Sequence, residues 1–349
     1  MSSSDAGRQR QIRALVVDNV VGMSQRRQLV EALQVDGDIS VIATSTMAAQ
    51  AVECVGEARP DVIILDLHLR DGESQRAIEQ IMARSPTPIL VMSAAEEGSS
   101  VPVVRALVAG ALEALPRPDR WTAALSAELR QSVRQVTSVQ VIRHPRGGHA
   151  KEHRSTATAS ARHPVVAIAA STGGPSALAV LLSGLAGLQG PVLVVQHLHA
   201  DFTHGLVEWM SRVSALPVET AVHDVAARAG RVFFAPGGAH LHYTAAGRLE
   251  LATSPVTVHR PSADELFSSV AEHAGPAGIG VLLTGMGDDG ALGLLSIRQR
   301  GGHTFAQDQA TSAVFGMPNA AARLGAVTDL VALDKLAAAI QRAVREVRA

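Results

Sequence analysis

The chain has 349 residues, of which 47% are hydrophobic and 18% are charged, and its formal net charge is −1. This composition excludes a globally disordered chain, and the near-zero charge gives no overall attraction to nucleic acid or to an anionic membrane. The single cysteine, Cys54, excludes an internal disulfide and fits a reducing compartment. Because no apolar run is long enough to span a bilayer and no apolar signal segment opens the chain, we expect a cytoplasmic protein without membrane insertion.

Short apolar runs alternate with helical stretches through the first third of the chain. The runs expected to be strands cover residues 14–17, 39–43, 62–65, 89–92 and 111–115. Such alternation predicts a doubly wound parallel sheet. The carboxyl ends of parallel strands meet at one edge of a sheet, so the polar residues that follow four of these runs should lie close together. These residues are Asp18, Asp66, Ser93 and Arg117.

At these positions the chain resembles a response-regulator receiver domain, which has a flavodoxin-like fold. The resemblance implies that Asp66 is the phosphoacceptor, that Ser93 is the hydroxyl residue of the pocket, and that a histidine kinase is a partner. It also implies a Mg²⁺ site that includes Asp18 and Asp66. However, Asn19 stands where a second acidic residue is expected, and Arg117 stands where a lysine is expected. We therefore expect weak Mg²⁺ binding and an eroded phosphorylation site.

A polar segment separates this region from the rest of the chain. Apolar residues at helical spacing between Trp121 and Val136 predict the last helix of the first domain. After Ile142 the chain is rich in Pro, Gly, Ser and Thr and has no apolar periodicity, which is typical of a flexible linker. We therefore predict a receiver domain at residues 1–142, a linker at 143–164 and a second α/β domain at 165–349.

The second domain repeats the strand-then-helix pattern. Apolar runs at residues 165–169, 192–195 and 279–283 predict three buried strands, and the segments 232–238 and 240–243 predict a short hairpin region. Beyond the ends of the three buried strands lie Ser171, His197 and Asp289, which should therefore converge at one edge of a Rossmann-like parallel sheet. A serine hydroxyl becomes a nucleophile when an imidazole accepts its proton and a carboxylate orients that imidazole. The three residues predict hydrolysis of an acyl compound.

Each of these features also has an interpretation without such chemistry. The Gly-rich turn around Ser171 is compatible with a plain turn or a phosphate-binding loop, although neither GxGxxG nor GxxxxGK[ST] is present. His197 is compatible with a core histidine, and Asp289 with a helix cap. The order Ser, His, Asp and the absence of GxSxG exclude the α/β-hydrolase arrangement. His240 and His242 lack an evident third ligand, so we expect them to be structural or to line the substrate rim rather than to bind a metal.

Five segments in a fixed order carry a second resemblance. They are ASTGGP around Ser171, VVQH ending at His197, HRPSADELF from His259, LLTGMGDDGA around Asp289, and AVFGMP from Ala313. With these segments the chain resembles the chemotaxis protein-glutamate methylesterases, whose members hydrolyse glutamyl methyl esters on chemoreceptors and often deamidate receptor glutamines. The resemblance implies a methylated chemoreceptor as substrate and partner, and catalysis without a metal or other cofactor.

The same resemblance implies the roles of individual residues. Ser171 would be the nucleophile, His197 the general base and Asp289 the residue that orients it. Met286 would supply an oxyanion-binding N–H from its backbone, and Thr172 would help to position His197.

Three further expectations concern the neighbours of these residues and the alternative function. The family usually has GMGND where this chain has GMGDD, so Asp288 is the variant neighbour of Asp289. His259 and Arg260 are expected to line the substrate groove. The alternative function is a signalling or scaffold protein of a non-chemotaxis pathway, with the receiver used for docking.

Overall fold

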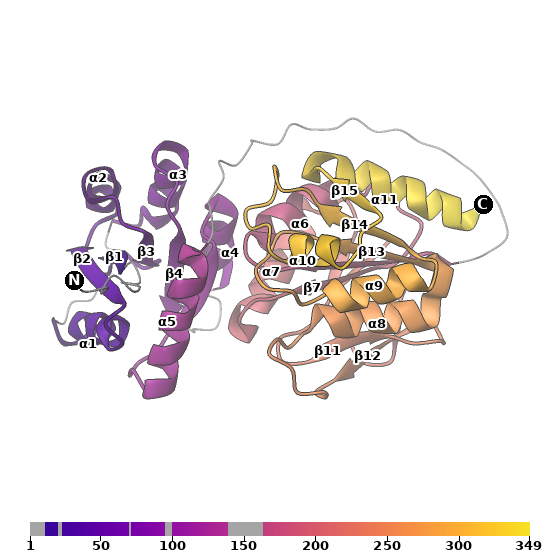
Figure 1. Cartoon of the computed structure of the whole chain (residues 1–349), viewed down its shortest axis with the longest axis horizontal. Coiled ribbons are helices and arrows are strands. Elements are labelled where there is room, and N and C mark those ends of the chain that lie inside the picture. Colours follow the sequence, from indigo (N-terminus) through magenta and orange to yellow (C-terminus); the bar gives the residue numbers. More distant parts are fainter. Residues whose placement is uncertain (1–10, 20–22, 70, 95–99, 139–162) are drawn as a thin grey trace, which may run out of the picture. The chain divides into compact units, whose positions relative to one another are not determined.

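The structure is a computed structural model that describes residues 11–19, 23–69, 71–94, 100–138 and 163–349. The chain divides into two compact units, Met1–Arg143 and His144–Ala349, and each contains a parallel sheet with helices packed on it (Figure 1). The predicted linker lies outside the described residues up to position 162. Among the described residues, no helix combines the length and the apolar character needed to cross a membrane.

The first unit contains a five-stranded parallel sheet in the order β2-β1-β3-β4-β5, which is the flavodoxin-like order and confirms the predicted fold. The strands are β1 (Ile12–Val17), β2 (Ile39–Ser45), β3 (Val62–Asp66), β4 (Ile89–Ala94) and β5 (Glu113–Arg117). The helices are α1 (Met23–Gln34), α2 (Ala48–Ala58), α3 (Ser74–Arg84), α4 (Ser100–Ala109) and α5 (Ala123–Thr137). All five residues of β3 are buried, as expected for a central strand covered by helices on both faces.

The fifth strand begins two residues later than predicted. We expected it at residues 111–115, whereas β5 spans Glu113–Arg117. Gly110 follows α4 with a φ of +122°, and the next two residues complete the turn out of the helix. Arg117 is therefore the last residue of β5 rather than a residue that follows the strand. Its position at the carboxyl edge of the sheet is unchanged.

The second unit contains a seven-stranded parallel sheet in the order β15-β14-β13-β6-β7-β10-β8 and a small antiparallel sheet in the order β11-β12-β9. The strands of the large sheet are β6 (Val165–Ala170), β7 (Val192–Gln196), β8 (Val218–Thr220), β10 (Val232–Phe234), β13 (Gly278–Leu282), β14 (His303–Gln307) and β15 (Asp329–Val331). Those of the small sheet are β9 (Val225–Ala226), β11 (His240–Tyr243) and β12 (Arg248–Ala252). The helices are α6 (Gly174–Ser183), α7 (Ala200–Val213), α8 (Ala263–Ala274), η1 (Gly275–Ala277), α9 (Ala291–Gln299), α10 (Met317–Arg323) and α11 (Leu333–Arg348).

The prediction that residues 232–238 and 240–243 form a hairpin is wrong. β10 pairs in parallel with β7 and β8, because its three apolar residues are buried on both faces of the large sheet. β11 instead pairs in antiparallel register with β12 in the small sheet. The two segments therefore belong to different sheets.

β6 lies at the centre of the large sheet, between β7 and β13. All six of its residues are buried, and helices cover both faces of the sheet, α6 and α11 on one side and α8 and α9 on the other (Figure 1). From β6 the chain continues to β7 on one side, whereas β13 continues to β14 on the other. Such a switch point is where doubly wound sheets bind ligands, at the carboxyl ends of the strands. Ser171 is the first residue after β6.

Candidate active site

Ser171, His197 and the loop that carries Asp289 follow three adjacent strands, β6, β7 and β13. Two backbone hydrogen bonds join these strand ends. The His197 N–H donates to the Ala170 carbonyl at 3.0 Å, and the Ser171 N–H donates to the Thr284 carbonyl at 3.0 Å. These bonds fix Ala170 to the carboxyl end of β7 and Ser171 to the segment that follows β13.

The His197 imidazole is paired with Asp289. Its Nε2 lies 2.8 Å from Oδ2 of Asp289, and both side chains are largely buried, with 7% and 13% exposure. Because a carboxylate only accepts hydrogen bonds, Nε2 carries a ring proton, and in the neutral imidazole Nδ1 then carries the lone pair. In the described part of the chain, the buried Nδ1 has no hydrogen-bond partner. It is the ring atom that is available to accept a proton.

The carboxylate of Asp289, which belongs to the loop after β13, lies beside the N-terminus of α8 and accepts hydrogen bonds from three donors there. The Ser262 hydroxyl donates to Oδ1 at 2.8 Å, the Ala263 N–H donates to Oδ2 at 2.7 Å, and the Asp264 N–H donates to Oδ1 at 3.0 Å. Burial alone would raise the pKa of Asp289, but the hydrogen bond and charge of His197 and these backbone donors together lower it well below its usual range. Asp289 therefore stays ionised beside the imidazole.

Ser262 is a residue of this site for which the sequence predicted no role. Ser262 is the N-cap of α8, and its hydroxyl also accepts from the Glu265 N–H at 3.4 Å. The S-x-x-E spacing from Ser262 to Glu265 is a capping-box signal that could have located this helix start.

The turn after β6 is tightly packed around Ser171. The Ser171 carbonyl accepts from the Gly174 N–H at 2.7 Å and from Nε2 of Gln196 at 2.9 Å. Gly173 has a φ of +75°, and a Cβ at Gly285 would lie 2.8 Å from the Ser171 Cβ. The two glycines therefore allow the conformation and the close approach that place Ser171 against the loop after β13.

The other residues predicted for this site lie in the loop after β6, which carries Thr172, and in the loop after β13, which carries Met286 and Asp288. The Thr172 carbonyl accepts from the Thr284 hydroxyl at 2.9 Å, and Thr284 also accepts from the Val314 N–H at 2.9 Å. Thr284 therefore ties the two loops together, a role that sequence reasoning missed. Met286 is half-buried in the loop after β13, and the neighbouring Asp288 is exposed.

His259 and Arg260 come from the segment that precedes α8. The His259 ring lies parallel to that of His197, with centroids 4.1 Å apart and an interplanar angle of 10°. Arg260 is half-buried, and in the described part of the chain its buried Nε has no hydrogen-bond partner. The structure therefore brings His259 directly to His197, which the sequence did not predict.

His240 and His242 use their ring nitrogens in hydrogen bonds within the fold. Nδ1 of the fully buried His240 accepts from the Ser262 N–H at 3.1 Å, and its Nε2 donates to the Pro255 carbonyl at 2.9 Å. Nε2 of His242 lies 3.1 Å from Oε2 of Glu265. No cluster of three or more histidine, cysteine or acidic side chains suited to a metal occurs among the residues that the structure describes.

In the first unit, Arg117 bridges the two buried aspartates of the carboxyl edge. Its Nη1 donates to Oδ1 of Asp18 at 2.8 Å, its Nη2 donates to Oδ2 of Asp18 at 3.0 Å, and Nη1 also contacts Oδ2 of Asp66. The other oxygen of Asp66 accepts from the His68 N–H at 2.8 Å. Burial raises the pKa of Asp66, against the opposing effects of this hydrogen bond and of the Arg117 charge.

The comparisons with known proteins agree with both halves of this description. The CheB methylesterase model matches residues 166–340, and the response regulator receiver domain model matches residues 14–126. A protein-glutamate methylesterase/protein-glutamine glutaminase of Anaeromyxobacter dehalogenans is 43% identical over 98% of both chains. The protein-glutamate methylesterase FrzG of Myxococcus xanthus is 40% identical over 84% of this chain and 88% of its own. The chain belongs to the CheB methylesterase family.

A solved structure supports the fold of the second unit. The CheB methylesterase catalytic domain of Thermotoga maritima is 32% identical to this chain, covers 52% of it and 98% of its own length, and has a TM-score of 0.50. Three expectations are thereby confirmed: the family, the fold of two parallel-sheet α/β domains, and the assignment to the hydrolases.

The receiver residues of this CheB-family chain do not fit Mg²⁺ in the arrangement that the structure has. Mg²⁺ requires oxygen ligands in near-octahedral geometry. Both oxygens of Asp18 and one oxygen of Asp66 already accept from Arg117, whose guanidinium supplies positive charge and no lone pair. The side-chain nitrogen of Asn19 donates to the His68 carbonyl at 2.5 Å. The buried Ser93 hydroxyl lies 3.5 Å from the Ala94 carbonyl, a long contact.

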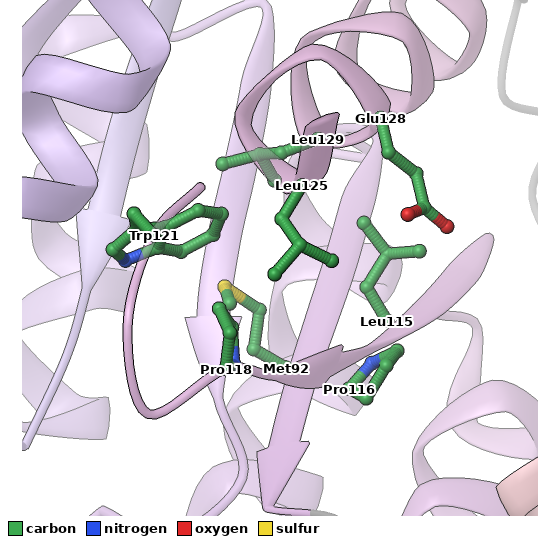
Figure 2. A pocket seen from close by; sticks show the side chains of 8 residues that line it. All are labelled: Met92, Leu115, Pro116, Pro118, Trp121, Leu125, Glu128 and Leu129. Atoms are coloured by element: carbon green, nitrogen blue, oxygen red, sulfur yellow. The ribbon is translucent and has the colours of Figure 1, made fainter. Parts of the chain in front are cut away.

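The receiver also contains a mostly apolar pocket lined by residues of β4, β5, α5 and the connection between β5 and α5 (Figure 2). It is lined by Met92, Leu115, Pro116, Pro118, Trp121, Leu125, Glu128 and Leu129. Pro116 and Pro118 flank Arg117 in the chain, and their rings fix two backbone φ angles beside it. These two prolines therefore restrict the backbone on either side of Arg117.

Proposed function

We propose that this chain hydrolyses glutamyl methyl esters on a chemoreceptor with Ser171, His197 and Asp289, and that it also deamidates receptor glutamines. The observation that carries the proposal is the His197 imidazole, whose Nε2 is bound by Asp289 while its buried Nδ1 is unpartnered in the described part of the chain. The names of the relatives from Anaeromyxobacter dehalogenans and Myxococcus xanthus support the choice of substrate.

In the proposed mechanism, Oγ of Ser171 attacks the ester carbonyl carbon and passes its proton to Nδ1 of His197. The imidazolium that forms is stabilised by the Asp289 carboxylate at Nε2. The tetrahedral intermediate then breaks the bond to the methoxy group, which takes the proton from Nδ1 and leaves as methanol. Water hydrolyses the acyl-enzyme by the same proton transfers and restores Ser171. With a glutamine substrate the leaving group is ammonia.

Three further residues have proposed supporting roles. The backbone N–H of Met286, in the loop that packs on Ser171, would stabilise the negative charge on the carbonyl oxygen. Thr172 would position His197 through the turn that it shares with Ser171. Arg260 would line the groove for the substrate, next to His259.

The nucleophile is tested by methanol release from methylated receptor membranes. Ser171→Ala should lower the turnover about 10⁴-fold or more, because only binding and oxyanion stabilisation remain. Ser183→Ala is the matched control, since Ser183 is an exposed serine of α6, and it should act like the wild type. Turnover by Ser171→Ala close to that of the wild type would contradict the proposal. Absence of methanol release by the wild type itself would favour the alternative, a signalling or scaffold protein of a non-chemotaxis pathway.

We further infer that the receiver, with proposed bounds 1–142, accepts a phosphoryl group at Asp66 only slowly. Phosphoryl transfer to a carboxylate requires an accessible oxygen and a cation that stabilises the transferred group. Arg117 contacts one oxygen of Asp66, and the His68 N–H is bonded to the other. A histidine kinase as the phosphodonor, and a cytoplasmic location, belong to the same proposal.

A further inference from the structure

His259 is the one residue with an aromatic ring stacked on His197 among the residues that the structure describes. Its segment is held at both ends by the fold. The Pro255 carbonyl accepts from Nε2 of His240, and the Gly238 N–H donates to the Arg260 carbonyl at 3.2 Å. Nearer to the ring, the Thr257 hydroxyl donates to the His259 carbonyl at 2.5 Å. The backbone therefore fixes the place of His259 independently of any ligand.

The same segment also binds the carboxylate of the pair. Three residues after His259, the Ser262 hydroxyl and then the Ala263 N–H donate to Asp289. One stretch of chain thus contacts His197 through a ring face and Asp289 through hydrogen-bond donors. Movement of this stretch would disturb both partners of the His–Asp pair together.

A general base must keep its ring plane fixed while it exchanges a proton. The plane of the His197 ring has to contain both the Nε2–Asp289 contact and the direction from Nδ1 to the proton donor. A second ring lying flat at 4.1 Å resists rotation out of this plane and excludes water from that face. Desolvation of its ring, and next the charge of His197, lower the pKa of His259, whereas the Asp289 and Asp288 carboxylates raise it. The neutral form of His259 is therefore favoured, which avoids repulsion of an imidazolium at His197.

We propose that His259 is a positioning residue that holds the His197 ring in its proton-transfer orientation by stacking on it. This inference rests on the function proposed above and concerns the same site. It assigns to His259 a role in turnover rather than in substrate binding. A residue that only lines the groove would act on KM, whereas a residue that orients the base acts on kcat.

The test compares His259→Ala with His259→Phe in the full-length protein. His259→Ala should lower kcat for methanol release about tenfold with KM nearly unchanged, and His259→Phe should restore most of kcat because it keeps a flat ring. Reaction of Ser171 with a fluorophosphonate probe gives a second readout that needs no receptor, and it should slow in the Ala variant and recover in the Phe variant. His273→Ala, an exposed histidine in the last turn of α8, is the matched control.

The following outcomes overturn the proposal in distinguishable ways. An unchanged kcat in His259→Ala, with Ser171→Ala inactive, rejects the positioning role and leaves the proposed function intact. A change in KM alone identifies His259 as a groove residue. Wild-type turnover by Ser171→Ala rejects Ser171 as the nucleophile, and with it the site that His259 would support, whereas absence of methanol release by the wild type rejects the proposed function itself. Where His259→Ala fails to fold by circular dichroism, His259→Gln replaces it, and equal kcat values for the Gln and Phe variants reject the stacking argument.

Discussion

The two domains of this chain each hold buried aspartates at the carboxyl edge of a parallel sheet, yet the partners of these carboxylates differ. Asp289 binds one nitrogen of His197, whose other ring nitrogen is unpartnered within the described residues. Asp18 and Asp66 instead bind the guanidinium of Arg117. Imidazole can accept and release a proton near neutral pH, whereas guanidinium stays charged. The first pairing can therefore take part in proton transfer, and the second can only neutralise charge.

The largest expected effect comes from removing the charge of the aspartate that pairs with His197. Asp289→Asn should lower kcat about 10³–10⁴-fold, because an amide at this position stabilises neither the required tautomer nor the imidazolium. The neighbouring Asp288 is exposed, so Asp288→Asn is the matched control and should stay near the wild type. Methanol release measures both variants. A larger loss in Asp288→Asn than in Asp289→Asn would show that the pairing assigned to His197 is wrong.

The second prediction alters the receiver pairing. The double variant Asn19→Asp, Arg117→Lys should label Asp66 about tenfold faster than the wild type with a small-molecule phosphodonor and Mg²⁺. The variant gains a carboxylate, and it replaces the bidentate guanidinium with a compact ammonium. Phosphorylated protein is quantified by intact mass against time.

Two control variants accompany this measurement. Arg120→Lys changes an exposed arginine of the same domain and should label like the wild type. Asp66→Asn should abolish labelling in both backgrounds. Rapid and near-complete labelling of the wild type would contradict the inference that Arg117 blocks Asp66.

The sequence was sufficient to predict most of the fold and the positions of the paired residues. Apolar runs that end in Ser171, His197 and Asp289 indicated one sheet edge, because parallel strands align their carboxyl ends. The stack of His259 on His197 was not predictable in this way. That contact depends on the path of the irregular segment between β12 and α8, in which the sequence has no helical or strand periodicity.

The receiver site was predicted only in part. Counting charges correctly indicated that Asn19 removes a negative charge and that Arg117 keeps a positive one. It did not indicate that both carboxylates bind the same guanidinium, since this depends on how far the Arg117 side chain reaches from β5 past β4 to the ends of β3 and β1. The start of β5 was also misplaced, because the two small or apolar residues after Gly110 continue the apolar pattern of the strand.

A fourth carboxyl group, that of Glu113, has a neutral hydrogen-bond partner and extends the comparison between the two pairings. It lies at the first position of β5, and the Ser132 hydroxyl donates to its Oε1 at 3.2 Å. Burial raises the pKa of Glu113 to about 7, the hydrogen bond from Ser132 opposes this effect, and the charge of Glu128 adds to it. No cationic side chain pairs with Glu113 among the residues that the structure describes, so its carboxyl group keeps the proton up to about pH 7.

This raised pKa gives the smallest predicted effect, a pH dependence of receiver stability. In the unfolded chain Glu113 loses its proton near 4.5, and in the folded domain it keeps the proton up to about 7. The unfolded state therefore binds fewer protons between these two pH values, so the contribution of Glu113 to stability falls as the pH rises through this window. Glu113→Gln mimics the protonated form and should raise the Tm of the receiver transition by a few degrees at pH 8 and by little at pH 4. Glu128→Gln, measured by the same thermal scans, should give a smaller gain at pH 8, because it removes only the neighbouring charge. An equal Tm for the wild type and Glu113→Gln at pH 8 would show that Glu113 is ionised in the folded domain at no cost.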